Sequence, residues 1–182
     1  MADSADWNLS NQPFTWEAWV YPKSNIATYP TIMEHYVDPG NDRTYLRLER
    51  QGGLDRFEFE VDIGGTKTVE VYSDDTPPKD AWTHVAVCRV GNVFTMYVDG
   101  VAQSNPVTNT VTIPDRAAVF RIGEWGGTGT NGDWKGYMDE IRVSNVARYT
   151  ASFTPDTAQS VSYTHLRAHE TREDRGCRGV GG

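Results

Sequence analysis

The chain has 182 residues, and 17 Lys and Arg against 25 Asp and Glu give it a formal net charge of −8. Such a chain repels a phosphate backbone, which argues against nucleic acid as a partner. No apolar run approaches the roughly 18 residues of a membrane span. Aromatic residues make up 12% of the chain and 17 positions are glycine, which is typical of one all-β domain with short strands and many turns.

Segments in which apolar and polar residues alternate, bounded by Gly and Pro, occupy most of the chain. The first, residues 14–20, carries aromatic side chains on both faces and predicts a central strand. Further strands are predicted at residues 31–36, 44–49, 56–63, 68–73, 83–90, 93–99, 118–123 and 134–143. In the last of these, Met138, Ile141 and Val143 share no single alternating register, and a β-bulge at Asp139-Glu140 would reconcile them.

Residues 82–100 predict a β-hairpin, because Gly91-Asn92 can adopt the positive φ angles of a two-residue turn. Pairing across this turn places Val90 opposite Val93, Arg89 opposite Phe94, Val87 opposite Met96 and Val85 opposite Val98. One face, formed by Val85, Val87, Phe94, Met96 and Val98, is apolar apart from Arg89, so it should pack on a second sheet. The other face, which includes His84 and Tyr97, is expected to be partly solvated.

Four motifs follow one another in the order found in laminin-G-like, concanavalin-A-like domains. They are residues 14–20 (FTWEAWV), the hairpin, residues 121–123 (RIG) and residues 136–143 (GYMDEIRV). On these motifs the chain resembles that family, which implies an all-β fold, a two-sheet antiparallel jelly-roll sandwich of the concanavalin-A-like lectin/glucanase type. Residues 144–155 are similar to the version common in tail and virion surface proteins of bacteriophages. The resemblance implies a location on the virion surface or otherwise extracellular, and it does not indicate the ligand.

The resemblance extends over roughly residues 3–155, so residues 1–160 are assigned to one jelly-roll domain. Relatives usually carry one strand before this region and one after it, so the domain is expected to lack its first and last strands and to belong to a longer protein. Residues 161–182 resemble an in-frame translation of a sequencing-library adapter followed by a Gly/Arg-rich stretch, which predicts a disordered tail. The tail residues His165 and His169 are therefore not interpreted as a metal site. Cys177 also lies there, so Cys88 is expected to be a small buried thiol without a disulfide.

Three carboxylates, Glu58, Glu60 and Asp62, alternate along one predicted strand and share one face. Jelly-roll glycoside hydrolases similar to laminarinases use such a row, in which acid and nucleophile lie about 5 to 5.5 Å apart in retaining enzymes. The motif of that family runs Glu, Asp, Glu, which differs from the order here. We interpret the row as a solvated polar face and expect no enzymatic activity.

A second group of carboxylates, Asp99, Asp139 and Glu140, is expected on exposed faces. Calcium takes about six to eight oxygen ligands from carboxylates, carbonyls and water. In calcium-binding relatives the acidic residue of the Gly-x-x-Asp-Glu run is a plausible ligand, so the resemblance implies Ca²⁺ at Asp139. The alternative is that Asp139 accepts backbone hydrogen bonds at the bulge.

The six Trp residues raise the question of sugar binding, because sugar faces stack on indole rings. Five lie where the family buries aromatic residues and are expected in the core: Trp7, Trp16, Trp19, Trp82 and Trp134. Trp125 differs, because it opens a Gly-rich polar loop, residues 126–133, that cannot bury it well. We predict a ligand-binding site at Trp125, Asn131 and Asp133, together with Tyr97 from the hairpin face. The alternative is a plain surface loop whose glycines only turn the chain.

These features predict a noncatalytic recognition module that binds a glycan on a host surface and contacts other domains of a larger phage tail or virion protein. A structural decoration or spacer domain without a specific ligand is the alternative, and it would not need the Trp125 loop. A glycoside hydrolase is a third interpretation, but the sequence offers no convergent carboxylate pair for it.

Overall fold

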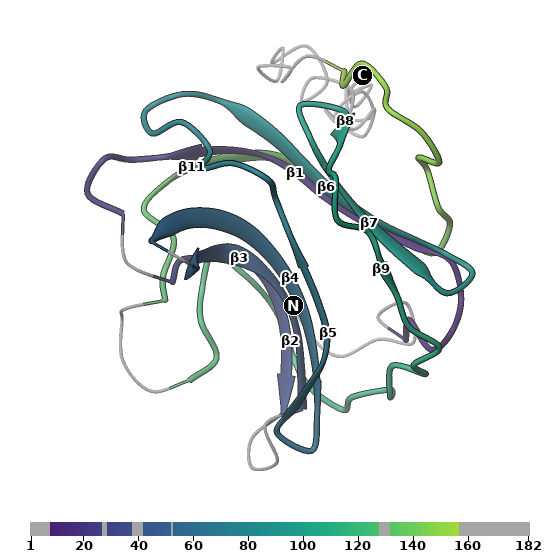
Figure 1. Cartoon of the computed structure of the whole chain (residues 1–182). Helices are drawn as coiled ribbons and strands as arrows, with labels where there is room; N and C mark the ends of the chain where they lie inside the picture. Colours follow the sequence, from purple (N-terminus) through teal and green to yellow (C-terminus); the bar gives the residue numbers. More distant parts are fainter. Residues whose placement is uncertain (1–7, 27–28, 38–41, 52, 128–131, 157–182) are drawn as a thin grey trace, which may run out of the picture.

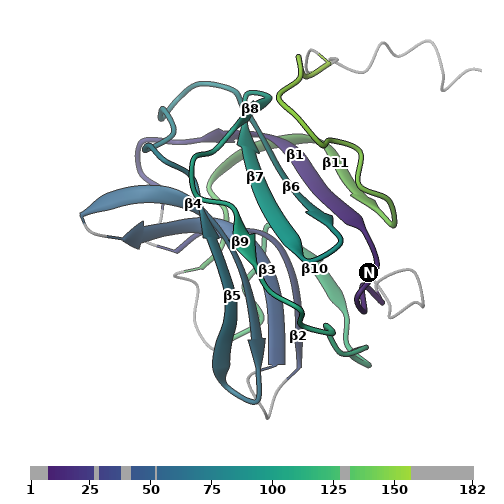
Figure 2. The same ribbon diagram turned by 45° about the vertical axis from the view of Figure 1, so that its right-hand side comes forward.

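The computed structural model describes residues 8–26, 29–37, 42–51, 53–127 and 132–156. Within these ranges every regular element is a β-strand, and the strands form two antiparallel sheets that pack face to face (Figures 1 and 2). The predicted all-β sandwich is confirmed. No helix in this part of the chain is long and apolar enough to cross a membrane. The predicted tail, residues 161–182, and the region of the predicted missing strands lie outside the described residues.

The six-stranded sheet has the order β11 (Gly136–Ser144), β1 (Phe14–Pro22), β6 (Thr83–Val90), β7 (Val93–Val98) and β8 (Val101–Ala102), and β9 (Val107–Thr108) also pairs with β7. The five-stranded sheet has the order β10 (Phe120–Ile122), β2 (Thr31–Val37), β3 (Asp42–Gln51), β4 (Leu54–Ile63) and β5 (Thr66–Tyr72). Figure 1 shows the second sheet strongly curved, with its concave side turned away from the first. Each predicted strand is present, and only the two-residue strands β8 and β9 were not predicted.

The hairpin of β6 and β7 has the predicted register. Val90 pairs with Val93, Arg89 with Phe94, Val87 with Met96 and Val85 with Val98. Gly91 has a φ of +57°, as the tight turn requires. Arg89 is fully buried at the end of this apolar face, where its guanidinium donates hydrogen bonds to the carbonyl oxygens of Gly91, Ser10 and Val111. These bonds satisfy the one charged group on that face.

The core fills the space between the two sheets. Trp16 of β1 lies at its centre, with ring centroids 5.7 Å from Phe59 of β4 and 5.2 Å from Phe120 of β10. Because β1 and β4 belong to different sheets, these edge-to-face contacts connect the two layers. The burial predicted for Trp16 is confirmed, since the residue is 1% exposed.

The bulge in β11 lies where the sequence predicts it. Pairing with β1 shifts register between Glu17, which faces Arg142, and Trp19, which faces Asp139. Glu140, inside the shifted segment, has a φ of +47°. The shift lets Met138, Ile141 and Val143 all pack against the core.

A C-terminal segment, residues 145–156, crosses the outer face of the six-stranded sheet; we call it the strap (Figure 1, yellow-green). Tyr149 and Phe153 of the strap pack over a small second core formed by Ala86, Cys88 and Tyr97. The amide of Phe153 donates to the carbonyl of Gly100 at 2.8 Å. The strap therefore buries most of this hairpin face, including His84 and Tyr97, and the partial solvation that the sequence predicts is limited to Thr95 and Asp99. Cys88 is a buried free thiol, as predicted.

Candidate functional site

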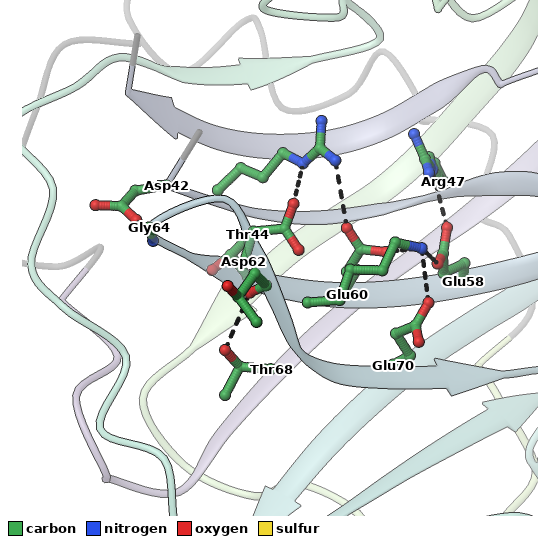
Figure 3. A network of polar contacts seen from close by, with 12 residues as sticks. Asp42, Thr44, Arg47, Glu58, Glu60, Asp62, Gly64, Thr68 and Glu70 are labelled. Carbon is green, nitrogen blue, oxygen red and sulfur yellow. Dashed lines mark hydrogen bonds and ion pairs between the residues drawn. The ribbon is translucent and has the colours of Figure 1, made fainter. Parts of the chain in front are cut away.

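The carboxylate row of β4 lies on the concave outer face of the five-stranded sheet, as the alternation predicts (Figure 3). It is not solvated, and that expectation is wrong: Glu58 and Glu60 are 0% exposed and Asp62 is 2% exposed. Long side chains from the neighbouring strands cover the row. Arg43 contacts Asp62 at 2.7 Å and Arg47 contacts Glu58 at 2.9 Å.

Lys67 of β5 lies in the middle of three carboxylates. Its Nζ is 2.6 Å from Glu60, 2.7 Å from Glu70 and 3.7 Å from Glu58. The same three carboxylates are close enough to hold a metal ion. The ammonium group already supplies the positive charge that such an ion would bring. We therefore assign these carboxylates to a buried ion-pair network and not to a metal centre.

The network contains more carboxylates than cations. Three cations, Arg43, Arg47 and Lys67, face five carboxylates, Glu49, Glu58, Glu60, Asp62 and Glu70. Burial raises the pKa of Glu58 and of Asp62 above the ordinary range. Burial alone would also raise the pKa of Glu60, but hydrogen bonds from Lys67 and Tyr45 lower it overall. Adjacent carboxyl groups with divergent pKa values are also typical of glycosidases, but a substrate cannot reach groups that are 0% exposed.

The predicted binding residue Trp125 lies in the connection between β10 and β11, at the β10–β2 edge of the five-stranded sheet. Its ring packs against the backbone of Gly127 and Gly132, where a Cβ atom would overlap the indole. The amide of Trp125 is 3.4 Å from the Asp133 carboxylate. Trp125 is therefore half-buried and held in place, whereas the sequence predicts a loop that cannot bury it.

The same connection docks on the sheet through its next residue. The amide of Gly126 donates to the Glu34 carboxylate, and its Cα lies so close to Tyr36 and Arg121 that a Cβ would touch both. Burial raises the pKa of Glu34, although the Gly126 amide and Arg121 oppose the shift. A shallow pocket of about 310 Å³ opens here; it is lined by Tyr36, Val37, Ala117, Ala118, Val119, Arg121 and Gly126.

The other predicted ligand-binding residues have different surroundings. Asn131 lies outside the described residues. Asp133 is half-buried and close to the backbone amide of Trp125. Tyr97 is 2% exposed beneath Tyr149 and Phe153. It belongs to the six-stranded sheet, whereas Trp125 lies at the edge of the five-stranded sheet, so we do not include Tyr97 in the site. The structure therefore brings together Trp125 and Asp133 only.

The predicted calcium ligand Asp139 is half-buried on β11, and its carboxylate accepts a 2.9 Å hydrogen bond from the amide of Glu140. This bond at the bulge is the alternative role that the sequence offers. Among the described residues, Asp139 is in no cluster of three side chains that could hold a metal. The Glu140 side chain lies 3.6 Å from Arg142. The described side chains therefore do not form a calcium shell, and calcium at Asp139 stays a prediction.

Another hollow lies on the opposite sheet, and sequence reasoning did not find it. It has a volume of about 420 Å³ and is lined by Glu17, Trp19, His84, Glu140, Arg142, Tyr149 and Asp156. Glu17 is its most buried carboxylate, 3% exposed, with the Tyr149 hydroxyl at 2.6 Å and the Arg148 Nε at 2.8 Å. Burial alone would raise the pKa of Glu17, but His84, Tyr149 and the arginines lower it overall. The available sequence signal was Glu17 and Trp19 on the outward-facing positions of β1.

Comparison with known proteins identifies the family to which this fold belongs. A family model, Laminin_G_3 of the concanavalin A-like lectin/glucanases superfamily, matches residues 2–152. No curated protein matches the chain.

Several solved structures are similar. A Bacteroides ovatus protein proposed to bind carbohydrate has a TM-score of 0.60 at 20% identity, over 82% of this chain and 43% of that one. Domain 4 of the Geobacillus stearothermophilus arabinanase AbnA, in complex with arabinotriose, has a TM-score of 0.54 at 24% identity, over 76% of this chain and 62% of that one. The CBM40 of a Ruminococcus gnavus sialidase, bound to α2,3-sialyllactose, has a TM-score of 0.60 at 10% identity, over 78% of this chain and 80% of that one. At these identities the likenesses establish the fold alone, and the chain spans less than two thirds of the first two structures. By its family match, the chain belongs to the concanavalin A-like lectin/glucanase superfamily.

Proposed function

We propose that the chain is a noncatalytic carbohydrate-binding module. Among the structures that share its fold are proteins named for carbohydrate binding and a domain in complex with arabinotriose. The one row of carboxylates that resembles a glycosidase site is sealed beneath Arg43, Arg47 and Lys67. Recognition without cleavage is the function that fits both facts.

The observation that carries the proposal is the held indole of Trp125. Two glycines and Asp133 fix its position, and the adjoining Gly126 is docked on Glu34 beside the 310 Å³ pocket. An aromatic ring that is rigid before binding loses little conformational entropy when a sugar stacks on it. We place the glycan over Trp125 and Asp133 at this edge of the concave face.

The setting that we propose is a phage tail or virion surface, with a host-surface glycan as ligand and other domains of the same protein as neighbours. Support comes from the resemblance of residues 144–155 to phage surface proteins. The structure gives those residues a defined role as the strap. A virion-surface or extracellular location follows from this setting and is part of the same proposal.

A glycan array followed by calorimetry on the strongest hit tests the proposal, with wild type compared with Trp125→Ala. We expect Trp125→Ala to weaken binding by about 1 to 3 kcal/mol, because the stacking surface is removed. Leu54→Ala is the control, since Leu54 is 41% exposed on β4, which β3 separates from the β10–β2 edge. Equal binding by wild type and Trp125→Ala would remove Trp125 from the site. Absence of binding by wild type to every glycan would favour the spacer alternative.

Calcium at Asp139 is tested separately. A ligand that binds only the native state raises its stability, so millimolar calcium should raise the thermal midpoint if Asp139 binds it. Asp139→Ala should then abolish the rise. A midpoint that calcium does not change would contradict the calcium prediction.

A further inference from the structure

The outer face of the six-stranded sheet carries a second row of ring and polar side chains. Alternate residues of β1 point outward, which places Glu17, Trp19 and Tyr21 on this face, about 7 Å apart along the strand. From the strands on either side, Tyr137 lies opposite Tyr21, and His84 lies opposite Trp19. The strap covers the β6–β7 part of the face and meets the row at Trp19, whose Nε1 donates to the Asp156 carbonyl at 2.9 Å. The rings of Trp19, Tyr21 and Tyr137 stay partly exposed beside the strap.

One end of the row is the 420 Å³ pocket. Trp19 and Tyr149 supply ring surfaces to it, while Glu140 and Arg142 supply an acceptor and a donor whose side chains are 45% and 39% exposed. Glu17 is held by the Tyr149 hydroxyl and by ion pairs with Arg148 and Arg142, so it fixes the wall of the pocket. The carboxylates of the pocket outnumber its guanidiniums: Glu17, Glu140 and Asp156 line it together with Arg142, and Arg148 pairs with Glu17 from the strap.

One residue that lines the pocket carries a buried ring nitrogen without a hydrogen-bond partner. His84 is 5% exposed, and its Nε2 is 3.4 Å from Glu17, but its Nδ1 has no hydrogen-bond partner among the described residues. A buried ring nitrogen without a partner costs free energy unless a ligand or water reaches it. Because His84 lines the pocket, a ligand in the pocket would lie beside this imidazole ring.

The other end of the row is an exposed aromatic platform formed by Tyr21, Trp82 and Tyr137. The centroid of Tyr21 is 5.6 Å from Trp82 and 5.5 Å from Tyr137, and the ammonium of Lys23 lies over both tyrosines at about 5 Å. Trp82 is 40% exposed and Tyr137 is 57% exposed. The expectation that Trp82 belongs to the core is therefore wrong. Single exposed aromatic residues are common, but a contiguous group of three is typical of a binding surface.

We propose that the pocket and this platform together form a second carbohydrate site, which binds a neutral oligosaccharide along β1. Hydroxyl groups both donate and accept hydrogen bonds, which matches the adjacent Arg142 and Glu140. The excess of carboxylates in the pocket repels an acidic ligand, which favours a neutral one. The spacing from Trp19 to Tyr21 suits a chain of several sugar rings, with its first ring in the pocket and later rings on the platform. This site lies on the sheet opposite Trp125 and does not depend on it.

The experiment uses the full chain and neutral arabinan, β-glucan, mannan and galactan oligosaccharides, each as the di-, tetra- and hexasaccharide. Binding is followed by calorimetry and by the NMR signals of the Trp19 and Trp82 indole N–H groups. We expect at least one series to shift both signals, with affinity rising from disaccharide to hexasaccharide. The double variant Trp82→Ala/Tyr137→Ala should lower hexasaccharide affinity roughly tenfold and leave disaccharide affinity unchanged, because only the longer chain reaches the platform.

Three comparisons decide the outcome. Val101→Ala, which alters an exposed residue of the same sheet, should bind as wild type does. Glu140→Gln should weaken even the disaccharide, since it alters the pocket and not the platform. Trp125→Ala should leave the Trp19 and Trp82 shifts in place.

If Trp125→Ala abolishes all binding, the proposed function stands and the second site is overturned. If only the β1-face variants lose binding, the second site stands and Trp125 is not a site. If no probe shifts Trp19 or Trp82, or the double variant keeps wild-type length dependence, the second site is overturned.

Discussion

Individual residues show how a charged face becomes part of the interior. Glu58, Glu60 and Asp62 sit on the side of β4 away from the core, where solvent would be expected, and are nonetheless almost fully buried. Their burial depends on the side chains of Arg43, Arg47 and Lys67, which lie over them from β3 and β5. The alternation along β4 predicts which face the carboxylates share. It does not predict their burial, because that depends on which strands pair with β4 and in which register.

A first prediction concerns Glu58 and pH. The pKa of Glu58 in the folded protein is raised to about 9, mainly by burial, from an ordinary value of 4.5. The folded state therefore favours the protonated form, and the stability that this supplies is present below pH 4.5 and is lost as pH rises toward 9. We expect urea unfolding at pH 5, 7 and 9 to show that the free energy of unfolding of wild type declines as pH rises. The decline should be smaller by about 2 kcal/mol in Glu58→Gln, because glutamine mimics the protonated carboxyl.

A second carboxyl of the row, Asp62, also contributes to this pH dependence. Asp62, whose pKa is raised to about 6, adds a decline of the same sign at lower pH, so the variant should still lose some stability between pH 5 and 7. Glu124→Gln, at an exposed carboxyl near the edge of the same sheet, serves as the control and should follow wild type. If the free energy of unfolding of Glu58→Gln falls with pH as steeply as that of wild type, Glu58 is ionised in the folded protein.

Glu17 gives the second prediction, with the opposite sign. Its pKa is lowered in the folded protein, so the stability it contributes is present above its ordinary pKa of 4.5 and is lost as pH falls. We expect Glu17→Gln to lower the free energy of unfolding by about 1 to 3 kcal/mol at pH 7 and by less at pH 3, because Tyr149 and Arg148 lose their charged partner. The exposed neighbour Glu140, mutated to Gln, should cost less than about 0.5 kcal/mol. Equal losses for Glu17→Gln at both pH values would show that its charge is unimportant.

Among the elements, the hairpin and the strap mark the limits of prediction from sequence. The β6–β7 register follows from Gly91-Asn92 and local alternation, both of which lie within one stretch of chain. The strap meets that hairpin across more than 50 residues of sequence, through contacts such as Tyr149 with Tyr97. It has no regular alternation, so its path over the sheet could not be predicted. For the same reason the 420 Å³ pocket, which needs Tyr149 as a wall, was missed.

The third prediction uses two glycines of the hairpin region to measure the strap contact. Gly91 and Gly100 have φ angles of +57° and +76°, so alanine at either position costs about 1 to 2 kcal/mol of backbone strain. At Gly91 a Cβ meets nothing within 4 Å, whereas at Gly100 it overlaps the Phe153 carbonyl and lies 2.8 Å from Pro155. We expect thermal or urea unfolding to show a further loss of about 1 to 3 kcal/mol for Gly100→Ala over Gly91→Ala. Matching losses would mean that the strap does not pack on Gly100.

In the whole molecule, the two sheets present outer faces of different kinds. The concave face of the five-stranded sheet is filled by the Lys67 network and leaves its polar pocket to the edge, where Gly126 is docked. The outer face of the six-stranded sheet is partly covered by the strap and leaves Trp82 and Tyr137 exposed. The sandwich itself could be predicted, because alternation and motif order determine which faces are apolar. The distribution of sites could not, because it depends on side chains that meet from strands far apart in sequence.

The last prediction compares two truncations of the chain. Deleting residues 161–182 should leave the thermal midpoint unchanged within about a degree, because the sequence of that tail predicts no burial. Deleting residues 145–182 removes the strap as well and exposes Ala86, Cys88 and Tyr97, which are at most 2% exposed in the intact protein. The loss of that apolar contact should lower the midpoint by about 5 °C or more. Calorimetry of the two truncated proteins beside the full chain separates the contributions. A large fall on the shorter deletion would show that the tail packs on the domain, and no fall on the longer one would show that the strap contributes nothing to stability.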